Sequence, residues 1–62
     1  MEILQKRLLD VRTAATYLSI SRSKLYQWMA KNKVKSIKID GRRLLDIYDL
    51  NEFVESLKQN QN

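Results

Sequence analysis

Apolar residues recur with a helical period in three stretches of the chain. In the first, they fall at positions i, i+3, i+4 and i+7, which are Val11, Ala14, Ala15 and Leu18. Asp10 directly precedes this stretch, and its carboxylate can accept hydrogen bonds from the free N–H groups of a first helical turn. The pattern predicts an amphipathic helix that begins after Asp10 and ends near Leu18.

The second helical stretch follows after a short gap. Its apolar residues are spaced i, i+3, i+4 and are Leu25, Trp28 and Met29. The hydroxyl of Ser21 can cap a helix that runs roughly from 22 to 31. Two short helices joined by about three residues match the helix-turn-helix motif. Trp28 could instead stack on a nucleic-acid base, but its position beside two core residues favours the core.

A β-hairpin is predicted after the second helix. Residues 36–39 alternate polar and apolar side chains and are rich in β-branched residues, as in a half-buried strand. The dipeptide Asp40-Gly41 is typical of a type I′ turn, which needs a positive φ at both central residues. Residues 42–45 then form the returning strand.

Two registers of this hairpin fit the sequence. A two-residue loop places Ile37 opposite Leu44 on the core face and Lys38 opposite Arg43 on the outer face. A four-residue loop pairs Ile39 with Leu44 instead. The sequence alone does not choose between them.

The third helical stretch begins after Asp46, which is expected to cap it. Its apolar stripe consists of Ile47, Leu50, Phe53, Val54 and Leu57. The predicted fold is therefore mainly α with a small β-hairpin, a winged helix-turn-helix of three helices and a two-stranded wing. We expect residues 1–7 to form a flexible N-terminal arm, 8–58 to form the domain, and 59–62 to form a frayed tail.

Composition excludes several classes of protein. The chain has 62 residues, without Cys or His, so disulfides and the usual zinc sites are excluded. One Gly and no Pro leave no glycine-rich phosphate loop, and no apolar run approaches the ~18 residues of a membrane span. We expect no cofactor and no metal, and a cytoplasmic protein or one domain of a larger cytoplasmic protein.

Charge is distributed unevenly along the chain. Residues 21–43 contain eight Lys or Arg and one acid, whereas residues 44–62 contain four acids and one Lys. The basic excess thus lies on the second helix and the hairpin. This distribution indicates a polyanionic partner, most simply DNA.

An ordered set of residues resembles a known family. It runs Leu8-Leu9-Asp10-Val11, Ala14-Ala15, Tyr17-Leu18-Ser19-Ile20-Ser21-Arg22-Ser23, Leu25-Tyr26 and Trp28, and later Asp40-Gly41-Arg42-Arg43 and Asp49-Leu50. The set resembles the excisionase-type helix-turn-helix domain, a small relative of the MerR-like winged helices, over residues 8 to 57. Lys24 and Asp10 stand where Thr is usual in that family, and Ser19 and Asn32 stand where Gly is usual.

The resemblance implies a site-specific binder of double-stranded DNA. Family members act as recombination directionality factors or small transcription regulators of phages, plasmids and integrative elements. An integrase or recombinase is then a candidate partner, and cooperative self-association on DNA is expected because one helix and one wing contact few base pairs.

A recognition helix presents its N-terminal residues to base edges. Arg22 and Gln27 are the best candidates for base contacts, because their side chains can bond guanine and adenine in a bidentate manner. The full set of candidate DNA-binding residues is Ser21, Arg22, Ser23, Lys24, Tyr26, Gln27, Lys31, Lys38, Arg42 and Arg43.

Several candidates also have a plainer interpretation. Arg22 and Gln27 could lie on a solvated helix face, Ser21 could serve only as a cap, and the Tyr26 ring could only cover apolar surface. The two arginines after the turn could serve solubility. As a whole, the domain could instead be a protein-interaction or targeting module of a larger phage or plasmid protein. We do not expect an enzyme, because the acids of the third helix are spaced as cap and surface without a base or nucleophile.

Overall fold

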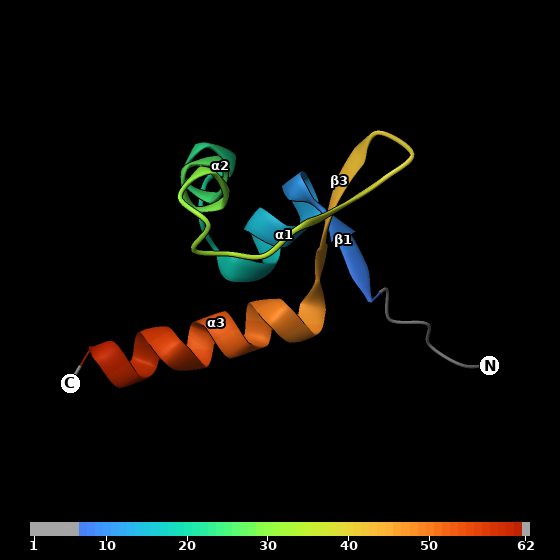
Figure 1. The fold of residues 1–62 in the computed structure, drawn as a ribbon. Coiled ribbons are helices and arrows are strands. Elements are labelled where there is room, and N and C mark those ends of the chain that lie inside the picture. The colour runs from blue at the N-terminus through green and yellow to red at the C-terminus, as the bar shows by residue number, and fades with distance from the viewer. Residues whose placement is uncertain (1–6, 62) are drawn as a thin grey trace.

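The computed structural model describes residues 7–61 and contains three helices and three short strands (Figure 1). In chain order these are β1 (Leu8–Asp10), α1 (Val11–Leu18), α2 (Arg22–Ala30), β2 (Ile37–Ile39), β3 (Arg42–Asp46) and α3 (Ile47–Asn60). The three predicted helices are present. Residues 1–6 of the predicted arm lie outside the described part. Arg7, the last residue of that arm, is anchored by hydrogen bonds to Asp46, and residues 59 and 60 of the predicted tail are helical.

The first two helices begin and end at well-defined caps. Asp10 Oδ1 accepts a hydrogen bond from the Thr13 N–H at 2.8 Å, and Ser21 Oγ accepts one from the Lys24 N–H at 3.1 Å. Ser19 ends α1 in the left-handed region with a φ of 61°, and Asn32 follows α2 with a φ of 58°. At both positions Gly is usual in the family that the sequence resembles. Here the two tight turns form with Ser and Asn instead.

Both helix ends show the same pattern of backbone hydrogen bonds. The N–H of Ile20 donates to the Ala15 carbonyl at 3.0 Å, and the N–H of Lys33 donates to the Trp28 carbonyl at 2.8 Å. Bonds of this kind, which reach back five residues across a left-handed residue, define the Schellman motif. Helix α2 is therefore delimited on both sides by the same type of turn.

The predicted two-stranded wing is present as β2 and β3, but it belongs to a three-stranded sheet in the order β1-β3-β2, and the third strand was not predicted. The additional strand β1 pairs antiparallel with β3, and Leu9 lies opposite Leu45. Both residues belong to the core, at 6% and 0% exposure. The segment before Asp10 is extended because Leu9 reaches the core beside β3. Three residues are too few to show a period of two in the sequence.

The hairpin has the two-residue loop, with Ile37 opposite Leu44 and Lys38 opposite Arg43. Asp40 and Gly41 both have positive φ, 51° and 78°, as a type I′ turn requires. However, the side of the hairpin predicted to face the core is exposed, and the side predicted to be exposed faces the core. Ile37 is 44% exposed, while Leu45 is fully buried.

Side chains alternate along a strand, so the position of Leu45 fixes the faces of the whole hairpin. Arg43 and its partner Lys38 lie on the face of Leu45, which we call the inner face. Leu44, Ile37 and Ile39 lie on the opposite, outer face.

The core lies between the helices and the inner face of the sheet. Its fully buried large side chains are Leu25 of α2, Leu45 of β3 and Leu50 of α3. Trp28 packs against this cluster and meets Phe53 edge-on, with ring centroids 5.0 Å apart, so its predicted place in the core is confirmed. Within residues 7–61, no helix is long and apolar enough to cross a membrane.

Candidate nucleic-acid interface

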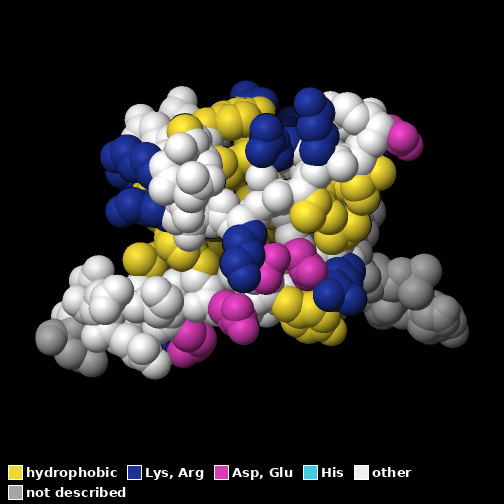
Figure 2. Space-filling model, viewed as in Figure 1, with side chains coloured by type: hydrophobic (Ala, Val, Ile, Leu, Met, Phe, Trp, Pro, Cys, Tyr) yellow, Lys and Arg dark blue, Asp and Glu magenta, His cyan; other side chains and the backbone are white. Residues whose placement is uncertain are grey.

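The candidate DNA-binding residues all lie at the surface of α2, its flanks and the hairpin. All ten side chains are exposed: Ser21, Arg22, Ser23, Lys24, Tyr26, Gln27, Lys31, Lys38, Arg42 and Arg43. In the space-filling view, Lys and Arg gather on the half formed by α2 and the hairpin, whereas most acids lie along α3 (Figure 2). The charge asymmetry of the sequence is thus also an asymmetry of the folded surface.

The N-terminal half of α2 presents unengaged polar side chains. Within the described residues, Arg22, Tyr26 and Gln27 make no side-chain hydrogen bond or ion pair. Tyr26 is 55% exposed, so much of its side chain is accessible at the surface. The hydroxyl of Ser21 is used as the helix cap, and the Lys24 ammonium lies 5.9 Å from the centre of the Trp28 ring. Arg22 and Gln27 are therefore free to contact an external ligand.

The two arginines after the turn point to different faces of the hairpin. Arg43 lies on the inner face, and its Nη1 donates a hydrogen bond to Ser36 Oγ at 3.0 Å. Together with Tyr26, Met29 and Ala30 of α2, Arg43 lines a hollow of about 210 Å³ between the helix and the hairpin. Arg42 lies on the outer face next to the turn, opposite Ile39. The predicted pair of tip arginines is thus split.

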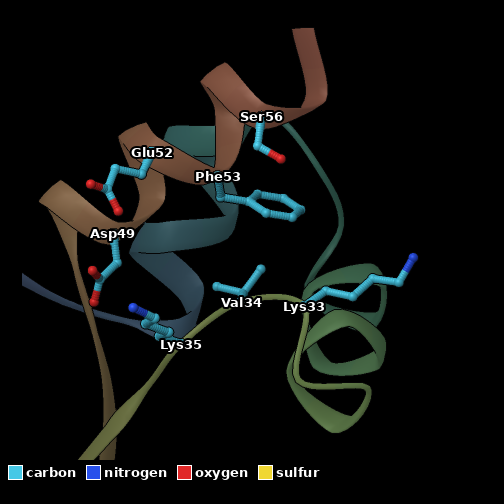
Figure 3. Close-up of a pocket in the computed structure, with 7 residues that line it drawn as sticks. All are labelled: Lys33, Val34, Lys35, Asp49, Glu52, Phe53 and Ser56. Atoms are coloured by element: carbon cyan, nitrogen blue, oxygen red, sulfur yellow. The ribbon is translucent and has the colours of Figure 1, made fainter. Parts of the chain in front are cut away.

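A second hollow separates the basic face from the acidic helix (Figure 3). Its volume is about 220 Å³, and it is lined by Lys33, Val34, Lys35, Asp49, Glu52, Phe53 and Ser56. In the close-up, Lys35 lies on the same side as the carboxylate of Asp49, while Lys33 points away from the hollow. Lys35 therefore lies between the hairpin and the acidic helix α3, whereas Lys33 extends away from that helix.

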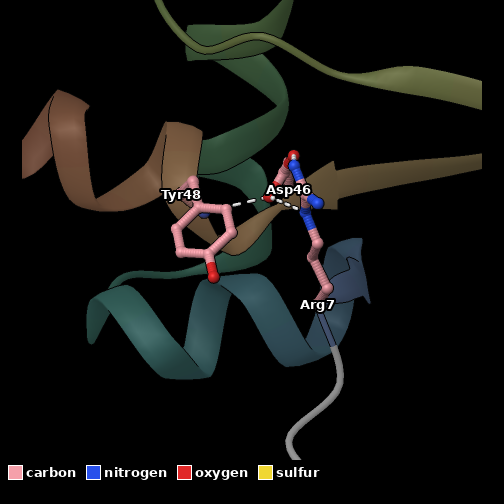
Figure 4. A network of polar contacts seen from close by, with 3 residues as sticks. All are labelled: Arg7, Asp46 and Tyr48. Carbon is pink, nitrogen blue, oxygen red and sulfur yellow. Dashed lines mark hydrogen bonds and ion pairs between the residues drawn. The ribbon is translucent and has the colours of Figure 1, made fainter.

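A polar network joins the start of β1 to the start of α3 (Figure 4). The Arg7 guanidinium donates to the Asp46 carboxylate at 3.0 Å and lies 4.7 Å from the centre of the Tyr48 ring. Hydrogen bonds from Arg7, and then from the Tyr48 backbone N–H, hold the pKa of Asp46 below its ordinary value. Asp46 also caps α3 through the Tyr48 N–H, so the same carboxylate joins Arg7 to the start of α3.

Among residues 7–61, no group of three or more His, Cys, Asp or Glu side chains comes together to hold a metal ion. What the described surface offers is a set of hydrogen-bond donors and cationic side chains around an exposed short helix. Such a surface suits phosphates and base edges.

Comparison with known proteins agrees with this arrangement. A model of the helix-turn-helix domain family matches residues 8–58. The chain belongs to the helix-turn-helix domain family. No curated protein and no solved structure matches the chain significantly. As a helix-turn-helix domain, the chain has α2 in the place of the recognition helix, and its family supports binding to double-stranded DNA.

Two features of the site were missed in the sequence. The sequence marks Ser36 only as part of a strand, yet its hydroxyl accepts a hydrogen bond from Arg43. Arg7 was assigned to the arm, although it anchors Asp46 across 39 positions of the chain. No local pattern marks a contact of that sequence separation, because helical and strand periods report only on near neighbours.

Proposed function

We propose that this helix-turn-helix domain binds double-stranded DNA in a sequence-specific manner, with α2 in the major groove. The observation that carries the proposal is the exposed, unengaged pair Arg22 and Gln27 near the N-terminus of α2. Arg forms a bidentate contact with guanine O6 and N7, and Gln forms one with adenine N6 and N7. The pair is thus suited to distinguish base pairs.

The hairpin supplies the sequence-independent part of the binding. Arg43 lies beside α2, and its cross-strand partner Lys38 lies on the same inner face. Both are suited to the phosphate backbone that borders the groove. Arg42, beside the turn, is suited to the adjacent backbone or to a narrow minor groove, whose negative potential attracts Arg. Ser23, Lys24, Tyr26 and Lys31 would add phosphate contacts around the helix.

The biological role that we propose is that of an excisionase, acting as a recombination directionality factor, or of a small prophage transcription regulator. It is a binding role in the cytoplasm without catalytic chemistry of its own. One recognition helix and one wing contact few base pairs, so a single copy should bind weakly. Occupancy would then depend on adjacent copies on repeated sites or on an integrase-like partner, and copies on one face would bend the DNA.

Footprinting on the DNA that surrounds the protein's own gene tests the proposal. We expect protection of a short site, repeated if binding is cooperative, and competition by the same duplex but not by a scrambled one. A gel-shift titration then separates cooperative from independent binding. Equal affinity for every duplex would contradict sequence-specific recognition. No DNA binding at all would favour the alternative function, a protein-interaction or targeting module of a larger phage or plasmid protein.

A further inference from the structure

The outer face of the hairpin carries apolar side chains that the helices leave uncovered. Ile37 and Ile39 are 44% and 43% exposed, although both belong to a strand of the sheet. Leu44, which lies opposite Ile37 on the same face, is half-buried. Figure 2 shows hydrophobic side chains gathered on this side of the hairpin, away from the basic groups between the hairpin and α2. None of these three residues is part of the proposed DNA-binding set, whose only member on the outer face is Arg42, opposite Ile39.

The same hairpin also has an open backbone edge, because β2 is the outermost strand in the order β1-β3-β2. In a two-residue hairpin the residues that flank the turn, Ile39 and Arg42, form a hydrogen-bonded pair, and such pairs alternate along the strands. Ile37 is therefore the next β2 residue bonded to β3. The N–H and C=O of Lys38, between the two, point away from β3 toward the open edge.

We propose that this edge and the outer face form a docking site for an extended segment of a partner protein, which adds to β2 as a fourth strand. Strand addition of this kind uses main-chain hydrogen bonds for affinity and alternate side chains for specificity. The segment would pair one residue with Lys38 and lay its two neighbours over Ile37 and Ile39.

The structure specifies the chemistry of that segment. The residue that pairs with Lys38 lies on the inner face beside the ammonium group, where an acidic side chain is favoured. Its neighbours lie on the outer face against Ile37 and Ile39, where apolar side chains are favoured. The preferred sequence is therefore apolar–acidic–apolar in extended conformation.

Charge also argues against a second copy of this chain as the occupant. If two β2 strands paired antiparallel about their central residue, Lys38 of one copy would lie opposite Lys38 of the other, and like charges directly opposite are unfavourable. A heterologous acidic segment removes that conflict.

Nuclear magnetic resonance titration of the ¹⁵N-labelled protein, without DNA, tests the proposal. The probe is the peptide acetyl-Thr-Val-Glu-Val-Thr-amide, and the control has Lys in place of the central Glu. We expect shifts confined to the hairpin, slowed exchange of the Lys38 amide proton, and severalfold weaker binding of the Lys peptide. The Lys38→Glu variant should reverse this preference. Shifts centred on α2, or no preference between the peptides, would overturn the proposal.

Two further controls separate strand addition from other modes of contact. N-methylation of the central Glu removes the donor that faces Lys38 and should abolish binding, while N-methylation of the following Val, whose N–H faces away, should be tolerated. Ile39→Thr keeps a β-branched residue but removes apolar surface, so it should lose peptide binding and keep the hairpin. Equal tolerance of both methyl groups would overturn the proposal.

The Ile39→Thr variant also tests the other occupants. If the native protein is a dimer in analytical ultracentrifugation and the variant is a monomer, the outer face binds a second copy. If the variant loses DNA affinity but keeps peptide binding, the outer face is an apolar wedge for DNA. Either result would overturn the proposal. The peptide measurements do not depend on the proposed function, so their failure would leave DNA recognition by α2 untouched.

Discussion

Lys38 and Arg43 lie directly opposite each other on β2 and β3, on the inner face of the hairpin. Like charges in this arrangement destabilise a sheet. The Arg43 guanidinium donates a hydrogen bond to Ser36 Oγ on the same side of the hairpin. A phosphate placed between the hairpin and α2 would relieve the repulsion, which makes this pair a place where DNA binding and folding stability oppose each other.

Reversing one of these charges should therefore raise stability and lower DNA affinity. In Lys38→Glu, a cross-strand repulsion becomes an attraction, and we expect the free energy of unfolding to rise by roughly 0.2–1 kcal/mol. Urea denaturation measures this change, and fluorescence anisotropy with a labelled duplex measures the loss of affinity. Lys38→Gln, which only removes the repulsion, should fall between the two. A less stable Lys38→Glu variant would show that the opposed charges do not matter.

The left-handed residue at the end of α1 should respond to glycine. Ser19 has a φ of 61°, a conformation that costs a residue with a Cβ about 1–2 kcal/mol. Part of this gain is offset by the greater freedom of Gly in the unfolded chain, so we expect Ser19→Gly to stabilise the domain by up to about 1 kcal/mol. Asn32→Gly is the matched control and should gain less, because Asn tolerates this region. Thermal unfolding measures the stability of both variants. A larger gain for Asn32→Gly than for Ser19→Gly would contradict this explanation.

Mutations should distinguish residues that contact DNA bases from residues that contact the phosphate backbone. Arg22→Ala should cost ~1–3 kcal/mol on the true site and relax specificity at one base pair. Arg42→Ala should weaken binding to all sequences alike and reduce the slope of log K against log salt by about one. Both variants are titrated with specific and scrambled duplexes at several salt concentrations. If Arg42→Ala altered base preference while Arg22→Ala did not, the hairpin would be the reading element.

Stability should fall in acid through Asp46. Its pKa is lower in the folded protein than the ordinary value of 3.8, so the folded state binds this proton less tightly than the unfolded state. The stabilisation is complete above the ordinary value and is lost as the pH falls through the lowered pKa. Urea unfolding across this range should show a smaller acid-induced loss in Asp46→Asn.

The exposed ion pair on α3 provides the control for that experiment. Glu55 and Lys58 have side chains 66% and 67% exposed, and such pairs contribute little to stability. Glu55→Gln should therefore keep the acid-induced loss of the native protein. If Asp46→Asn and Glu55→Gln behaved alike, the Arg7 network would have no specific effect.

Truncating Trp28 should destabilise the core against which it packs. It packs against the core and meets Phe53 edge-on, and we expect Trp28→Ala to cost ~3 kcal/mol, the low end for a truncated aromatic, since it is half-buried. A small domain with ~3–5 kcal/mol in total would largely unfold. Trp28→Phe should stay folded. A folded Trp28→Ala variant that only loses DNA affinity, judged by circular dichroism and anisotropy, would assign Trp28 to the interface.

The helices could be predicted from the sequence because their information is local. The apolar period of α1 and the caps at Asp10, Ser21 and Asp46 each lie within a few residues of the structure they determine, and all three caps are confirmed. The exposed start of α2 followed from the same pattern. The turn at residues 40 and 41 was likewise recognisable from two residues.

The faces of the hairpin could not be predicted in the same way. Leu44 and Leu45 are adjacent, so either could face the core, and the alternation in β2 favoured Ile37 as the inner residue. In the structure Leu45 faces the core, where it lies opposite Leu9 of β1. Because that partner lies far away in sequence, the inward orientation of Arg43 became apparent only in the structure.

The two-residue turn, together with the inner and outer faces of the hairpin, constrains how the hairpin could change length during evolution. Adding one residue to each strand would reverse the faces at the turn end, because side chains alternate with a period of two. Adding two residues to each strand would restore them. Longer hairpins on this scaffold should therefore differ from this one by an even number of residues per strand. Their additional basic side chains should occupy every second position, in step with Lys38.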